Sequence, residues 1–132
     1  NPPFFEAADA PASPEPARAQ AHVMARGGLA RWIGAALRML RPRGRLALIQ
    51  RADKLGPCLD ALACKAGSVA IRAIHPRADA EAARVIVTAV KGGRGALRIL
   101  PPLVLHGPDG RFGARAEAIH RGEGLLAEDA TP

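Results

Sequence analysis

The sequence predicts an α/β fold, chiefly because an amphipathic helix is followed directly by a buried strand. Apolar side chains in residues 28–40 recur every three or four positions, so they share one face of a helix. Arg41-Pro42-Arg43-Gly44 ends that helix, because proline cannot continue it and glycine accepts the turn. Leu46-Ala47-Leu48-Ile49 is entirely apolar, like a strand buried on both faces of a sheet. This order is typical of layered α/β domains. The apolar stripe of the helix comprises Leu29, Trp32, Ile33, Ala36, Leu37 and Leu40.

The remaining elements follow from shorter patterns along the chain. Strands are expected at 68–75 and 83–91, and the second of these is rich in β-branched residues. Because no full helix separates them, we expect an antiparallel pair at one edge of the sheet. Residues 97–105 are extended but contain Pro101-Pro102, which suits an edge strand or a covering arm. Other expected elements are a loop at 5–27 with a short helix near 15–21, a helix at 52–65 delayed by Gly56-Pro57, and a helix at 114–120.

Composition limits the function classes. The chain of 132 residues fits one domain, and 48% hydrophobic content indicates a globular protein. No apolar run approaches the roughly 20 residues of a membrane span, and no secretory signal is visible, so we expect a cytoplasmic protein. The formal net charge of +7 favours nucleic acid as a partner, although many basic proteins bind none. Cys58 and Cys64 match neither a zinc site nor a redox pair, so both are expected to be reduced.

The first four residues, Asn1-Pro2-Pro3-Phe4, form a motif with a chemical rationale. They resemble the fourth conserved motif of amino-group methyltransferases, Asp/Asn/Ser-Pro-Pro-aromatic. An exocyclic amine is a poor nucleophile, because its lone pair is delocalised into the base. The side-chain oxygen of Asn1 and the carbonyl of Pro2 could accept its two hydrogens. Phe4 could stack on a flipped-out base, an interaction worth about 1–3 kcal/mol.

The order of elements extends this resemblance over the whole chain. It is similar to the C-terminal half of a class I S-adenosylmethionine-dependent methyltransferase, a Rossmann-like sheet with a terminal antiparallel hairpin. Within that superfamily the chain resembles the bacterial tRNA(Val) adenine-N6 methyltransferases. Phe4 in place of the commoner Tyr and Arg43 in place of Gly depart from the pattern. The matching stretches are Asn1–Phe4, Ser13-Pro14 with Arg18 and Ala21-His22, Leu48–Asp53, His75-Pro76-Arg77, Arg84–Val87, Lys91–Arg94, Leu103–His106 and Asp109-Gly110.

The resemblance implies S-adenosylmethionine as the cofactor and RNA, specifically tRNA, as the substrate. It places most cofactor contacts upstream of the motif, so residues 1–132 are expected to lack the cofactor-binding half and to be inactive alone. Gly92-Gly93-Arg94-Gly95 opens no helix and is expected to be a turn rather than a nucleotide loop. An apolar sheet left half-covered would favour self-association. Three alternatives stay open: an rRNA guanine-N2 methyltransferase, a protein-glutamine methyltransferase, and a non-catalytic basic RNA-binding module.

Outside the motif, five residues are candidates for substrate binding. Arg18 and His22 lie one helical turn apart and could face the substrate near the catalytic loop, or could be solvated loop residues. Arg77, Lys91 and Arg94 flank the expected hairpin and could grip an RNA backbone, or could be ordinary exposed charges. No metal site is expected, because the four histidines lie far apart without carboxylate or cysteine partners.

Overall fold

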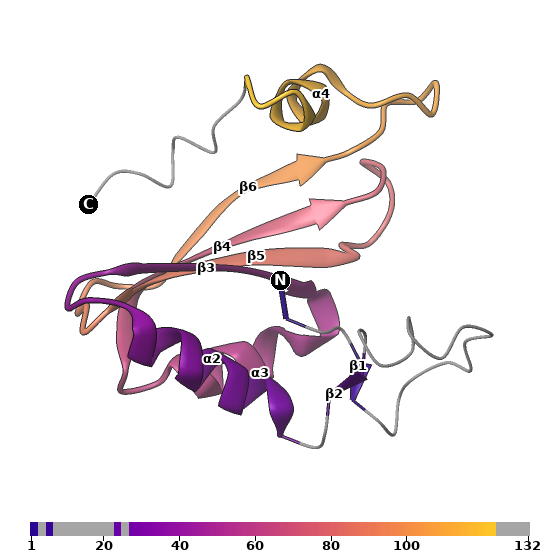
Figure 1. Cartoon of the computed structure of the whole chain (residues 1–132). Helices are drawn as coiled ribbons and strands as arrows, with labels where there is room; N and C mark the ends of the chain where they lie inside the picture. The colour runs from indigo at the N-terminus through magenta and orange to yellow at the C-terminus, as the bar shows by residue number, and fades with distance from the viewer. Residues whose placement is uncertain (3–4, 7–22, 25–26, 124–132) are drawn as a thin grey trace.

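The computed structural model describes residues 1–2, 5–6, 23–24 and 27–123. Its central feature is a four-stranded sheet of β3 (Arg45–Arg51), β4 (Ala66–His75), β5 (Arg84–Lys91) and β6 (Arg98–Val104). Helices α2 (Gly28–Met39) and α3 (Leu55–Leu62) cover one face of this sheet, whereas α4 (Ala114–His120) lies beside β6 on the other (Figure 1). β1 (Phe5–Glu6) and β2 (Val23–Met24) form a separate parallel pair. The expected short helix near 15–21 falls outside the described residues.

Helix α2 confirms the periodicity seen in the sequence. Gly27 precedes it in a left-handed conformation with φ 72°, and Leu40 ends it in an extended one. Leu29, Ile33 and Leu37 are its buried residues and point into the core. Trp32 packs against that core but stays half-buried, so it is only partly a core residue.

Helix α3 is shorter than the expected 52–65. A 3-10 turn at Ala52–Lys54 precedes it, and the helix itself begins at Leu55. Pro57 therefore stands in its first turn, where the missing N–H is not needed for an intrahelical hydrogen bond. The helix ends at Leu62, because Ala63 is extended and Cys64 is left-handed with φ 61°.

The sheet has the order β3-β5-β4-β6. β4 and β5 are an antiparallel pair, which confirms the expected hairpin. Its expected place at the edge is wrong, however, because β5 pairs with β3 on one side and β4 pairs with β6 on the other. Extended residues 98–104 take the edge instead, in parallel with β4, despite the two prolines. Proline is tolerated there because an edge strand needs ladder hydrogen bonds on one side only.

Strand β3 is buried on one face only, which corrects the expectation of burial on both. Leu46 and Leu48 are buried toward the helices, whereas Ala47 on the opposite face is exposed. Among the described residues β3 pairs with β5 alone, in an antiparallel register. The sequence of an apolar strand shows which side chains are apolar, but it does not show whether another layer of the fold covers both faces of the strand.

A buried arginine ties the edge strand to the sheet. Arg72 of β4 is 0% exposed, and its Nη1 donates a 2.6 Å hydrogen bond to the carbonyl oxygen of Pro101. The register between β4 and β6 shifts at this point, between Arg72 and Ile74. A charged donor thus satisfies a carbonyl in the irregular, proline-containing part of β6.

The two cysteines are free, as expected, and their surroundings differ sharply. Burial within α3 raises the pKa of the Cys58 thiol to about 11, whereas Cys64 is exposed. At pH 8 we expect one thiol per native chain, Cys64, to react with a disulfide reagent, because the thiolate is the reactive form. Both should react in 6 M guanidinium chloride. Two rapidly reacting thiols in the native protein would contradict this packing of Cys58.

Candidate functional site

The motif begins near the carboxyl end of β3, where Figure 1 places the N-terminus. Asn1 is exposed and Pro2 is fully buried. Pro3, Phe4, Arg18 and His22 lie outside the described residues. The roles assigned to the four motif residues and to Arg18 and His22 stay predictions. Because Asn1 is exposed, its amide is accessible to a substrate.

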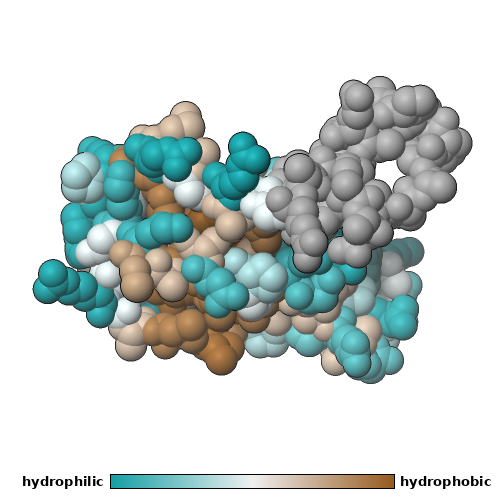
Figure 2. Space-filling view, turned by 90° about the horizontal axis from the view of Figure 1, so that it is seen from below, coloured by the Kyte–Doolittle hydropathy of each residue, from teal (hydrophilic) through white to brown (hydrophobic). Residues whose placement is uncertain are grey.

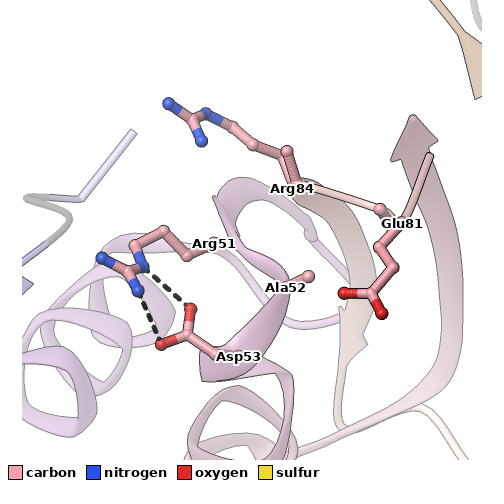
Figure 3. Close-up of a pocket in the computed structure, with 7 residues that line it drawn as sticks. Arg51, Ala52, Asp53, Glu81 and Arg84 are labelled. Carbon is pink, nitrogen blue, oxygen red and sulfur yellow. Dashed lines mark hydrogen bonds and ion pairs between the residues drawn. The ribbon is translucent and has the colours of Figure 1, made fainter. Parts of the chain in front are cut away.

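An open hollow of about 440 Å³ lies at this end of the sheet. Both β3 and β4 pair antiparallel with β5, and β6 is parallel to β4, so the carboxyl ends of β3, β4 and β6 lie together. We call this edge of the sheet the carboxyl end, and the opposite edge the amino end. The hollow is lined by Arg51, Ala52, Asp53, Glu81, Ala82, Ala83 and Arg84 (Figure 3).

Arg51 and Asp53 form a bidentate pair at the mouth of this hollow. Nε and Nη2 of Arg51 donate to the two carboxylate oxygens of Asp53, at 2.8 and 3.0 Å. The hydrogen bond from Arg51 is the main cause of a lowered pKa at Asp53, so the carboxylate stays ionised at neutral pH. Because both side chains are substantially exposed, the pair adds little to stability. Its effect is to fix the direction of the Arg51 guanidinium.

Arg84 stands directly opposite Arg51 in the β3–β5 register. Cross-strand partners share a face of the sheet, and like charges in that position destabilise it. Asp53 offsets part of this repulsion, and Figure 3 shows Arg84 extending away from Glu81. Two guanidinium groups in one hollow are suited to a phosphate or carboxylate group, which arginine binds through paired N–H donors.

Gln50 is a buried polar residue that the sequence analysis left without a role. It is 1% exposed at the end of β3, and its Oε1 accepts a 2.9 Å hydrogen bond from the backbone N–H of Arg51. The contact steadies the chain where β3 turns into the 3-10 segment. The signal was visible in the sequence, because a glutamine directly follows the apolar run 46–49.

The three basic residues that flank the hairpin, all candidates for substrate binding, lie at opposite ends of the sheet. Arg77 is exposed in the loop after β4, at the carboxyl end, and forms an ion pair with Asp79 at 3.5 Å. Lys91 is the last residue of β5 and Arg94 follows it, both at the amino end, and Nζ of Lys91 donates to the carbonyl oxygen of Leu40 at 2.7 Å. One compact substrate cannot touch all three, since an eight-residue strand is about 26 Å long.

Metal ligands and membrane-spanning helices are two further features of the described residues that bear on function. Within those ranges no group of three or more His, Cys, Asp or Glu side chains could hold a metal ion. No described helix is long and apolar enough to cross a membrane. His75 is engaged locally, because its Nδ1 lies 2.8 Å from the carbonyl oxygen of Ala80 and must donate to it.

Comparison with solved structures finds a similar protein. A crystal structure from Agrobacterium tumefaciens, described as a predicted O-methyltransferase, superposes with a TM-score of 0.71 and 29% sequence identity. The match covers 74% of this chain and 48% of the other, so the chain spans about half the length of that protein. The chain is related to methyltransferases. Its fold is the mixed α/β sheet of part of such a domain, as the sequence indicated. No family model matches the sequence, and no curated protein does either.

The described residues do not by themselves fit S-adenosylmethionine, the methyl donor that a methyltransferase implies. The glycine-dense stretch at 92–95 is a turn at the amino end and opens no helix. Two of its glycines are closely packed, because a Cβ at Gly93 would lie 3.0 Å from the carbonyl oxygen of Val90 and one at Gly95 would lie 2.5 Å from Oγ of Ser68. The hollow at the carboxyl end offers Arg51, Asp53 and Arg84, but none of its described lining residues is a glycine that would let a nucleotide approach the backbone closely.

Proposed function

We propose that this chain is the C-terminal, catalytic-loop part of a class I methyltransferase domain that methylates the exocyclic amine of an adenine in tRNA. The observation that carries the proposal is Asn1-Pro2-Pro3-Phe4, at the start of a chain whose remaining elements have methyltransferase topology. The cofactor would be held mainly by the preceding part of the domain. The relationship to methyltransferases supports the reaction class, and the motif supports an amine as acceptor.

The chain's own contribution would be to orient the amine. The Asn1 side-chain oxygen and the Pro2 carbonyl would accept its two hydrogens, which directs the lone pair outward. S-adenosylmethionine, held mainly by the preceding part of the domain, would supply the methyl group, and the amine would release one proton to water. No general base is required, so catalysis would rest on positioning and on fixed polar groups. Arg51 and Arg84 could hold a substrate phosphate beside this site.

Four alternatives remain, each with its own support. Phe4 also occurs in rRNA guanine-N2 methyltransferases, and a glutamine amide poses the same chemical problem as a base amine. A basic RNA-binding module without catalysis would equally explain the charge of +7. The similar crystal structure is described as an O-methyltransferase, so a hydroxyl acceptor belongs in the same test.

The products of one labelling experiment separate these possibilities. The complete domain would be incubated with methyl-labelled S-adenosylmethionine and undermethylated total RNA or protein, and the digests analysed by mass spectrometry. We expect label in N6-methyladenosine from tRNA. Label in N2-methylguanosine, methylglutamine or an O-methyl product would replace the proposed substrate. No label in any fraction would favour the binding module.

A further inference from the structure

Three turns far apart in the sequence meet at the amino end of the sheet. Backbone hydrogen bonds join them: Arg43 N donates to Lys91 O, Lys91 N to Gly44 O, and Gly92 N to Lys65 O, at 3.2, 2.9 and 2.9 Å. The segments concerned are residues 38–45, 63–67 and 90–98, and we call this surface the basic end. Its geometry is set by the β3–β5–β4 register, so the turns hold fixed positions relative to one another.

The basic end carries charge of one sign. No Asp or Glu occurs in its three segments, although the turns at the carboxyl end contain Asp53, Asp79, Glu81 and Asp109. Within the described ranges no carboxylate pairs with its exposed Arg41, Arg43 or Arg94. The cations of the basic end are Arg38, Arg41, Arg43, Arg45, Lys65, Lys91, Arg94 and Arg98, eight of the 19 Lys and Arg in the chain.

Arg43 adopts a backbone conformation that residues other than glycine rarely adopt. Its φ of 64° is left-handed, a conformation in which a side chain is strained and glycine is favoured. The exposed Cys64, in the adjoining turn, has a similar φ of 61°. Both positions keep a side chain where glycine would be less strained, and the two side chains differ in charge. At position 43 that side chain is an exposed guanidinium.

A shallow hollow of about 750 Å³ continues the basic end along α2. Its charged lining residues are Arg31, Arg38 and Lys65, with no carboxylate, and half-buried Trp32 lies among them. Small residues, including Gly34 and Ala35, keep the hollow open. Figure 2 shows this helix side, where hydrophilic residues in teal lie between apolar ones in brown. Cations beside a partly exposed aromatic side chain are typical of surfaces that bind nucleic acid.

We propose that the basic end binds the phosphate backbone of a folded RNA, at a distance from the catalytic loop. This inference rests on the proposed function, since it makes the RNA substrate contact both ends of the sheet. Strand β3, with seven residues, separates the two ends by about 23 Å. A single phosphate could meet only two or three of the eight cations. An A-form RNA helix would have to extend over several base pairs to reach from one end to the other.

Two glycine substitutions test the role of Arg43 in the 132-residue chain. Arg43→Gly should raise Tm by about 2–6 °C through relief of the left-handed strain, and should weaken tRNA binding several-fold. The slope of log Kd against log salt should fall by about one. Cys64→Gly is the matched control and should raise Tm similarly without changing tRNA affinity. Arg43→Gly with unaltered affinity and salt slope would overturn the proposal.

Charge-reversal variants show whether tRNA binding depends on the basic end or only on the net charge of the chain. Arg43→Glu/Arg94→Glu and Arg111→Glu/Arg115→Glu change the net charge equally, and the second pair lies in or beside α4. We expect the first pair to weaken tRNA binding at least about tenfold and the second to have a much smaller effect. Equal losses would show that overall charge alone matters, and would refute the proposal. Tighter binding of polyglutamate or of anionic phosphatidylserine vesicles than of tRNA would also refute it.

Kinetics of the complete domain distinguish this inference from the proposed function. Arg43→Glu/Arg94→Glu should raise KM for tRNA while leaving kcat unchanged, and should not affect a short oligonucleotide that carries the target base. If tRNA is methylated with an unchanged KM, the basic end is not a substrate surface and the proposed function stands. If no RNA is methylated by the unsubstituted domain, the proposed function itself fails.

Discussion

Replacing Asn1 with alanine in the complete methyltransferase domain should slow methyl transfer by about 10²–10³-fold, the usual effect of deleting one preorganised polar group at a reacting centre. In the proposed function the side-chain amide oxygen of Asn1 accepts a hydrogen of the amine. Its loss would free the nucleophile to rotate away from the methyl group. Because Asn1 is exposed in the structure, the substitution should leave folding intact. Single-turnover rates with tRNA and labelled cofactor measure the effect.

The control for this experiment is Asn1→Asp, which keeps an acceptor oxygen at the same place and occurs naturally in this motif. It should retain much more activity than Asn1→Ala. Cofactor affinity, measured by calorimetry, should be similar in all three proteins, because the proposed role concerns the acceptor. Full activity in Asn1→Ala would show that the motif is a turn without a catalytic role. A parallel loss of cofactor binding would indicate damage to the fold.

Ile33→Ala should have the largest effect on stability. Ile33 is 0% exposed and lies between Leu29 and Leu37 on the buried face of α2, within the main core cluster. Truncation removes buried methylene groups and leaves a cavity, at a cost of about 2–5 kcal/mol. This is a large part of the roughly 5–15 kcal/mol that stabilises a typical domain. Urea unfolding followed by circular dichroism should show the lowered midpoint.

Met39→Ala supplies the comparison within the same helix. Met39 is 88% exposed, so its truncation should change the free energy of unfolding by no more than about 0.5 kcal/mol. A similar destabilisation by both substitutions would mean that helix propensity, rather than packing, dominates in α2. Alanine has the higher propensity in both cases, which makes that outcome physically unexpected.

Local patterns were sufficient to predict most of the elements. The apolar stripe of α2, the turn at Pro42 and the β-branched run of β5 each predicted their element, since local spacing determines which face can be buried. The partner of each strand was harder to infer. The sequence indicated that 68–75 and 83–91 would pair, but not that β5 would lie between β4 and β3. Strand order depends on tertiary packing, which the periodicity of a single segment does not encode.

The candidate site was predictable only in part, for a related reason. Asn1-Pro2-Pro3-Phe4 is a contiguous motif and could be read directly. The hollow at the carboxyl end and the basic end combine residues that are far apart in the sequence, such as Arg43 and Lys91, which are 48 positions apart. The basic residues of these two surfaces are scattered along the sequence. Their common location follows from the register of β3 against β5, in which Arg45 stands opposite Val90.

The central position of β5 has a consequence for the order in which the chain can fold. Strand β3 is made before β4, yet its pairing partner in the described sheet ends at residue 91. During synthesis the apolar segment 46–49 therefore waits for some 40 further residues before β5 is available to pair with it. The β4–β5 hairpin, closed by a loop of eight residues, has the smaller entropy cost and can form first. Until β3 docks on it, the edge of β3 that pairs with β5 stays open, and an open strand edge is prone to aggregation.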